Sequence, residues 1–227
     1  ILADDLGYGH LGVYGQEKIS TPAIDKLAAN GLRFTQFYAG STVCAPSRAS
    51  LMLGQSTGNA FIRGNIALAQ ADPAQTEAGV PQFDQLYALD QGQYPLPHDS
   101  FTLAKMLKER GYRTALLGKW GLGSHGNSGD PLAQGFEYFY GLSDQMRAHN
   151  HFPSHVWRNG SVEATENPYF SPHQPFVGNP DDPDAEGYNA GLGTEWFGDL
   201  LATEASDYIA KQKADLQKKV HNPELCD

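Results

Sequence analysis

The chain has 227 residues, of which 40% are hydrophobic and 19% are charged. This is the composition of a folded globular protein, long enough for one α/β domain or part of a larger one, and it excludes a disordered chain. The formal net charge of −10 excludes nucleic-acid binding through a broadly basic surface, so an anionic ligand would need a local cluster of Lys and Arg. No apolar run is long enough for a membrane span, and no signal peptide is present.

The first forty residues are expected to hold a helix between two strands. Residues 1–5 are typical of the end of a buried strand, whose first half we expect to precede this chain. Thr21 is expected to cap a helix that begins at Pro22 and buries an apolar face formed by Ile24, Leu27 and Ala28. Residues 32–38 alternate between apolar and polar side chains, as a strand does.

The middle of the chain repeats this order of elements. A helix is expected from Cys44 to Gly54, and a second from Asp99 or Ser100 to Gly111, with Leu103, Met106 and Leu107 buried. Residues 112–117 are expected to form a strand that leads into Gly118-Lys119-Trp120. The recurring helix, glycine, strand and loop predict an α/β sandwich with a largely parallel sheet.

Two stretches, 55–98 and 124–193, are rich in Gly, Pro and polar residues. We expect them to be loop-rich, with short strands in the second, and to shape a substrate pocket, because binding loops diverge most. Residues 195–216 return to a helical pattern with a buried stripe of Leu200, Leu201, Ala205, Tyr208 and Ile209.

Cys44-Ala45-Pro46-Ser47-Arg48 is the segment with the clearest chemistry. A helix N-terminus presents free N–H groups and the positive end of the helix dipole, which suit a tetrahedral anion. Cys44 stands at this end, Pro46 suits the first turn, and Arg48 supplies a permanent positive charge. Taken alone, such a segment is more often a buried cysteine beside a helix that starts at proline. The only other cysteine is Cys226, and a disulfide between the two is left open.

Two further segments belong with Cys44. Asp4 and Asp5 end the first expected strand, where active sites of open α/β sheets lie, and adjacent carboxylates repel each other unless a cation lies between them. Their oxygens suit Ca²⁺, with Mg²⁺ as the alternative. Lys119 follows another expected strand among glycines, where its ammonium can reach a bound anion. Alone, such residues are usually a solvated loop and a surface lysine.

Together these segments resemble the type I sulfatases, within the alkaline-phosphatase-like superfamily. The resemblance runs from Ile1 to at least Gly141 and rests on four motifs in the family's order: residues 2–9, 21–28, 44–54 and 118–123. It implies an alkaline-phosphatase-like sandwich with a mostly parallel or mixed central sheet flanked by helices, of which residues 1–227 are the N-terminal portion. This portion alone is expected to be inactive.

The resemblance also implies a mechanism. A maturation enzyme that reads Cys44, Pro46, Ser47 and Arg48 oxidises Cys44 to formylglycine, whose hydrate attacks the sulfur of an organic sulfate ester. Asp4, Asp5 and the modified Cys44 bind Ca²⁺, while Arg48 orients the hydrate and Lys119 binds the sulfate oxygens. The implied substrate is a sulfated small molecule or carbohydrate, and the implied location of the full-length protein is the periplasm or the outside of the cell.

Three departures from the family pattern stand out. Gly121 occupies a position where many members carry His, so His125, His149 and His151 are tentative replacements. His10 stands where the family often has Asp. The pair of metal ligands and the second Lys that the family carries later in its sequence do not occur in this chain. The alternatives are a phosphonate monoester or phosphodiester hydrolase of the same superfamily and an inactive truncated fragment.

Overall fold

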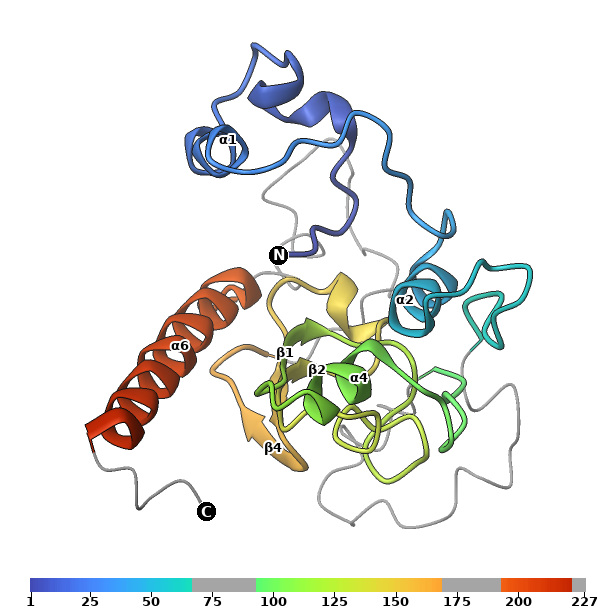
Figure 1. Ribbon diagram of the computed structural model, residues 1–227. Helices are drawn as coiled ribbons and strands as arrows, with labels where there is room; N and C mark the ends of the chain where they lie inside the picture. Colours follow the sequence, from blue (N-terminus) through green and yellow to red (C-terminus); the bar gives the residue numbers. More distant parts are fainter. Residues whose placement is uncertain (67–92, 169–192, 222–227) are drawn as a thin grey trace. The chain divides into compact units, whose positions relative to one another are not determined.

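The computed structural model describes residues 1–66, 93–168 and 193–221 (Figure 1). The chain divides into two compact units, Ile1–Ala39 and Gly40–Asp227. Cys44 forms no disulfide with any described residue, and because Cys226 lies outside the described residues, a disulfide between the two stays open. Within the described part of the chain, no helix combines the length and apolar character needed to cross a lipid bilayer.

The first unit contains helix α1, Pro22–Ala29, after two short 3-10 turns, η1 (Tyr8–His10) and η2 (Gly12–Tyr14). The helix was correctly predicted, but Ile24 and Leu27 are exposed rather than buried. Thr21 does not cap α1, because its hydroxyl accepts the N–H of Gly12 at 2.9 Å instead.

The two strands expected in the first unit, at residues 1–5 and 32–38, do not form. A strand needs a hydrogen-bonded neighbour, and the structure shows neither segment in a sheet ladder. No residue of this unit, all of which is described, is buried. The alternating pattern of residues 32–38 therefore lacks the buried face that would make it a strand.

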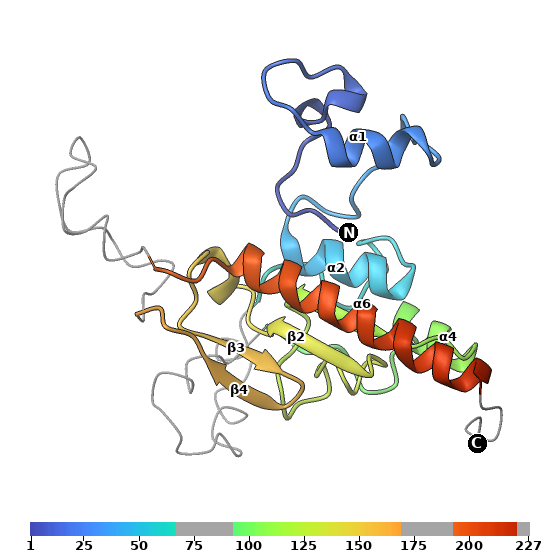
Figure 2. The same cartoon turned by 90° about the vertical axis from the view of Figure 1, so that its left-hand side faces the viewer.

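The second unit is built on a mixed sheet of four strands in the order β1-β2-β3-β4: β1 (Ala115–Lys119), β2 (Tyr138–Leu142), β3 (His155–Arg158) and β4 (Ser161–Ala164). β1 and β2 are parallel, with Lys119 opposite Leu142, and the other two pairs are antiparallel (Figure 2). β1 starts three residues and ends two residues later than predicted, so Lys119 ends the strand instead of following it. Strands β2 to β4 all lie within 124–193, which therefore supplies most of the sheet.

Helices cover both faces of this sheet and bury a separate apolar cluster on each (Figure 1). On one face, α2 (Cys44–Leu53) and α4 (Leu103–Glu109) pack against Leu116, Phe139 and neighbouring side chains. On the other, α6 (Phe197–His221) packs against Leu117, Tyr140 and others. Neighbouring residues of a strand thus serve opposite faces, as the alternation of a pleated strand requires.

Helix α4 begins later than predicted, at Leu103, because Thr102 is its cap. The Thr102 hydroxyl accepts the N–H of Lys105 at 3.2 Å and donates to the carbonyl of Gln134 at 2.6 Å. Fixed in this way, the helix buries Ala104 and leaves Leu103 and Met106 exposed, contrary to the prediction.

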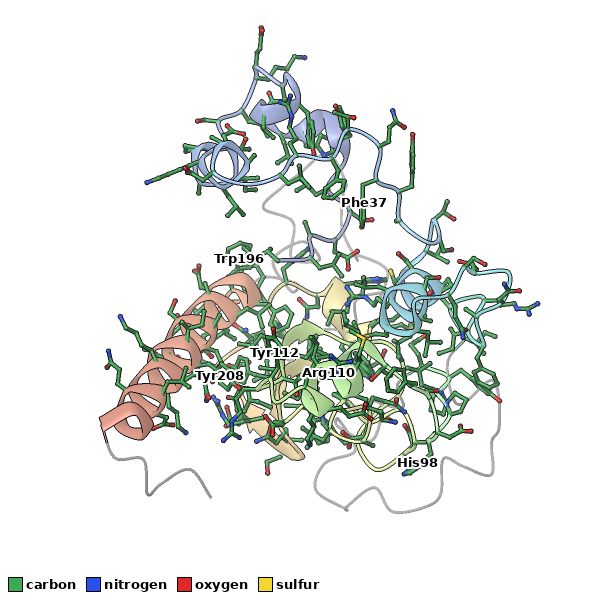
Figure 3. All side chains as sticks on the ribbon, viewed as in Figure 1. Phe37, His98, Arg110, Tyr112, Trp196 and Tyr208 are labelled. Atoms are coloured by element: carbon green, nitrogen blue, oxygen red, sulfur yellow. The ribbon has the colours of Figure 1, made fainter. Side chains whose placement is uncertain are left out.

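Helix α6 is tied to the sheet by a polar network around Arg158. The guanidinium of Arg158 forms a two-pronged pair with Glu204 on α6, at 2.7 and 2.9 Å, and also pairs with Glu163 at 2.6 Å. Tyr138 donates to Glu204 and its ring stacks on Tyr208, which Figure 3 shows on the side of α6 that faces the sheet. Of the predicted buried stripe, Leu200 and Leu201 pack on the sheet, but Ile209 is exposed.

The free energy of unfolding of this unit should depend on pH through Glu204. Its hydrogen bonds from Arg158 hold the pKa of the Glu204 carboxyl below its ordinary value of 4.5, despite desolvation. The carboxylate therefore stabilises the fold fully above that value, and this contribution is lost as the pH falls through the lowered pKa. Glu204→Gln is expected to remove about 1 kcal/mol of stability at pH 7 and a smaller amount at pH 3.

Urea unfolding of the full-length protein at both pH values measures this difference. Glu109→Gln, at the exposed end of α4, is the matched control. An equal loss at pH 3 and pH 7 for Glu204→Gln would contradict the expected role of the charge.

Candidate active site

Cys44 is the first residue of α2, as the sequence predicts. The helix begins after Val43, whose extended backbone leads into it, and ends at Gly54 in the left-handed region with φ of 63°. Ala45, Pro46 and Ala49 are buried against the sheet, while Ser47 and Arg48 are half-buried. The helix N-terminus is thus held against the core with the Cys44 side chain only partly covered.

Lys119 and Arg48 meet at this helix N-terminus. The Lys119 ammonium lies 3.2 Å from Cys44 Sγ, and Arg48 Nη1 donates to the Lys119 carbonyl at 2.6 Å. Lys119 ends β1, so the carboxyl end of a sheet strand reaches the first turn of α2. The structure therefore brings together three residues that the sequence placed in one site: Cys44, Arg48 and Lys119.

Asn65 is a member of this site that the sequence analysis missed. Its side-chain oxygen accepts the N–H of Ala45 at 3.0 Å. The N–H groups in the first turn of a helix, such as that of Ala45, have no partner inside the helix. The residue before α2, Val43, provides no side-chain cap for them. Asn65, which lies in a loop, therefore takes the place of the missing helix cap. No local sequence pattern around residue 65 predicts this contact.

Gly121, where the family pattern has His, adopts φ of +80° and lies against Gln145. A Cβ built on Gly121 would stand 2.8 Å from Gln145 Oε1, so a side chain at this position would displace Gln145. Among the tentative replacements, His149 in η5 (Arg147–His149) and His151 are exposed. His10 lies in the first unit, where its Nδ1 accepts the Gly7 N–H at 3.0 Å.

His125, the third tentative replacement, is packed as a core side chain. Its ring contacts Trp157, with 4.4 Å between ring centroids, and Phe139 at 5.4 Å. Its Nδ1 donates to Asp130 at 3.2 Å. Desolvation raises the pKa of Asp130, but this hydrogen bond and others outweigh it, so the pKa lies below its ordinary value. The roles of His125, His149 and His151 in catalysis stay predictions.

Asp4 and Asp5 lie in the first unit and are exposed. Asp5 adopts φ of 56°, a left-handed conformation that Asp tolerates better than most residues. As adjacent carboxylates they offer hard oxygen ligands that fit Ca²⁺, but only part of its coordination sphere. Throughout residues 1–66, 93–168 and 193–221, no three His, Cys, Asp or Glu side chains gather as a metal site would require.

The geometry around Cys44 suits nucleophilic attack on an anionic ester. Cys44, at the N-terminus of α2, lies beside the Lys119 ammonium. The Arg48 guanidinium is hydrogen-bonded to the carbonyl of the same Lys119 at the end of β1. Such fixed positive groups attract a tetrahedral anion and stabilise the charge that develops on its oxygens. Because the whole chain is acidic, this local cluster is what a negatively charged substrate would require.

Comparison with known proteins supports the family resemblance that the sequence motifs indicated. The profile of the sulfatase family matches residues 1–219. Human steryl-sulfatase is 43% identical over 148 residues, and mouse arylsulfatase G is 38% identical over 142 residues. Each match covers 63% of this chain and 23% of the relative, so the chain spans about a quarter of the length of these proteins.

Among solved structures, the crystal structure of Ps i-CgsB is similar, with a TM-score of 0.61 over 93% of this chain and 40% of that chain. Its sequence is 23% identical, so the likeness concerns the fold alone. Together with the family match, it confirms the predicted alkaline-phosphatase-like α/β architecture, with a sheet that is mixed.

Proposed function

This chain belongs to the sulfatase family, and from that premise we propose that the protein hydrolyses organic sulfate esters with an oxidised Cys44 as its nucleophile. The observation that carries the proposal is the 3.2 Å contact between Lys119 Nζ and Cys44 Sγ at the start of α2. After oxidation, the oxygens of a formylglycine hydrate would stand where Sγ stands now. The maturation enzyme that performs this oxidation would read Cys44, Pro46, Ser47 and Arg48.

The reaction proceeds in two steps, a displacement at sulfur followed by an elimination of sulfate. One hydroxyl of the hydrate loses its proton and attacks sulfur, the bond from sulfur to the ester oxygen breaks, and the ester oxygen takes up a proton, so that the alcohol leaves. The second hydroxyl then loses its proton, the bond between the formylglycine carbon and the sulfate oxygen breaks, and sulfate departs as the aldehyde forms again. Lys119 binds a sulfate oxygen throughout, and Arg48 orients the hydrate from its anchor on the Lys119 carbonyl.

Asp4 and Asp5 would hold a calcium ion together with ligands from elsewhere in the protein. When bound, this ion supplies positive charge that neutralises the oxygens of the sulfate group. The adjacency of the two carboxylates supports the proposal, since like charges at such a spacing favour a cation between them.

A sulfated carbohydrate is the substrate class we propose, with the loop-rich stretches 55–98 and 124–193 shaping its pocket; residues 67–92 and 169–192 of these lie outside the described residues. Aromatic side chains can stack on sugar rings. Trp120 and Tyr140 are buried, however, which favours a role in the core for these two. We propose that the full-length protein is periplasmic or secreted.

Parallel assays on an aryl sulfate, an aryl phosphonate and an aryl phosphodiester test the activity. The full-length protein is expressed with a formylglycine-generating enzyme, and peptide mass analysis verifies the oxidation of Cys44. Sulfate hydrolysis at the highest kcat/KM supports the proposal. A higher kcat/KM for the phosphonate or the diester would instead identify the related hydrolase.

Lys119→Met is expected to lower kcat/KM for the aryl sulfate by roughly 10²–10³-fold, because it removes a fixed charge from the developing oxyanion. Steady-state kinetics of the full-length protein measure the loss. Lys108→Met, on the exposed side of α4, is the control and should stay within about twofold. Equal kcat/KM in both variants would show that the ammonium does not contact the substrate.

A further inference from the structure

A hollow of about 630 Å³ opens where the C-terminal end of α2 meets the N-terminal end of α4. Two loops line it, one within residues 55–63 after α2 and one within residues 97–101 before α4. Its volume lies within the range of ligand pockets in proteins. The side chains that give the hollow its chemical character are Phe61, Phe101, Gln55, Asn59, Arg63 and Asp99.

The hollow is separate from the candidate active site. Cys44 is the first residue of α2, whereas Leu53, which lines the hollow, is the last of its ten residues. At 1.5 Å per residue, the two ends of this helix are about 14 Å apart. A ligand that fills only the hollow therefore leaves the groups around Cys44 free.

Two phenylalanine rings stand at the surface of the hollow. Phe61 is 51% exposed and Phe101 is 58% exposed. Each ring is followed by a buried residue, Ile62 in the apolar core and Thr102 at the cap of α4, so both loops are anchored where the rings face outward. The ring of Phe61 also contacts the ring of Tyr94, with 5.6 Å between centroids. Exposed apolar surface beside a hollow is typical of a place where a ligand or partner binds.

The polar side chains of the hollow offer both hydrogen-bond donors and acceptors. Arg63 supplies donors and Asp99 supplies acceptors, while the amides of Gln55 and Asn59 supply both. Arg63 Nε donates to the Ala60 carbonyl at 3.2 Å. The other three side chains have no hydrogen-bond partner among the described residues. Because the charges of Arg63 and Asp99 cancel, the hollow favours an uncharged ligand that both donates and accepts hydrogen bonds.

We propose that this hollow is a second, non-catalytic site that binds one or two neutral sugar rings of a glycan. The C–H groups on one face of a sugar ring form an apolar surface that packs against Phe61 and Phe101. The hydroxyls at the edge of the ring both donate and accept, as the polar side chains of the hollow require. Such a site goes beyond the proposed function, because it holds a glycan whether or not the protein hydrolyses sulfate esters. For a polymeric substrate, it raises the effective concentration of the polymer at the enzyme.

Isothermal titration of the full-length protein with neutral hexasaccharides of glucose, galactose, mannose and xylose tests this site. At least one of the four should bind saturably. Phe61→Leu and Phe101→Leu keep an apolar side chain but remove the flat ring, so each is expected to raise the dissociation constant of that sugar roughly tenfold. Phe61→Tyr keeps a ring and should bind within about twofold of the wild type.

Tyr112→Leu is the matched control. Tyr112, labelled in Figure 3, is an aromatic residue of similar exposure, 62%, and it lies beyond the other end of α4, outside the hollow. Its replacement should leave sugar affinity within about twofold. Because all of these rings are at least half exposed, the variants should keep the melting temperature and the aryl sulfate turnover of the wild type.

The outcomes separate this site from the proposed activity. If the wild-type protein binds none of the four sugars, or if Phe61→Leu binds them as tightly as Tyr112→Leu does, the sugar site is overturned and the activity is unaffected. A parallel loss of sugar binding and aryl sulfate turnover in the Phe61 and Phe101 variants would also overturn a separate, non-catalytic site. If the wild type binds a sugar through Phe61 but hydrolyses no sulfate ester, the sugar site stands and the activity is wrong.

Discussion

Cys44→Ala is expected to reduce aryl sulfate hydrolysis by the full-length protein by roughly 10⁴-fold or more, the scale seen when a covalent nucleophile is removed. Alanine keeps the start of α2, since Ala suits a helix and the neighbouring buried Ala45 and Pro46 are unchanged. The Lys119 ammonium also stays in place at the end of β1. The loss should therefore fall on kcat, with the anion-binding groups intact.

Cys226→Ala is the matched control, because it removes the other cysteine of the chain. Turnover and peptide mass are measured for both variants after expression with a maturation enzyme. The wild type and Cys226→Ala should show loss of the thiol mass at Cys44 together with activity. Full activity in preparations whose Cys44 is unmodified would refute the oxidised nucleophile.

The part of the site that sequence predicts is the part fixed by local signals. A cysteine before Pro46 and a glycine at residue 54 delimit α2, and both ends agree with the structure. Glycines around Lys119 indicated the end of a strand at the site, although the strand includes Lys119. These signals act through backbone geometry over a few residues, so a single sequence carries them.

Asn65 and Gln145 escaped prediction because long-range packing places them. Asn65 reaches Ala45 across twenty positions, and Gln145 reaches Gly121 only because β1 and β2 pair in parallel. The glycine at 121 was the one available signal, since a missing side chain at a site implies that another group fills the space. The sequence does not say which group, because that depends on the strand register.

Burial of the helices was predicted less well than their position. Leu103 and Met106 on α4 and Ile209 on α6 have the spacing of a buried face, yet all three are exposed. The orientation of α4 is set by Thr102, which binds both the helix N-terminus and the Gln134 carbonyl. Apolar spacing identifies a helix, but such tertiary contacts decide which of its faces meets the sheet.

Asp5→Asn is expected to weaken Ca²⁺ binding by the full-length protein at least roughly tenfold and to lower aryl sulfate turnover with it. Asn tolerates the left-handed backbone of residue 5, where φ is 56°, so the substitution removes a charge with little strain. It also relieves the repulsion between Asp4 and Asp5 in the metal-free protein, which further lowers the gain from binding a cation.

Isothermal titration with Ca²⁺ measures the affinity without reference to catalysis, and Asp207→Asn on the exposed side of α6 is the control. The control should leave both affinity and turnover within about twofold, because a single exposed carboxylate offers a cation little. The calcium proposal fails if the full-length protein keeps its full activity in excess chelator. It fails equally if Asp5→Asn and Asp207→Asn bind Ca²⁺ alike, since the charge at residue 5 would then contribute nothing to the metal site.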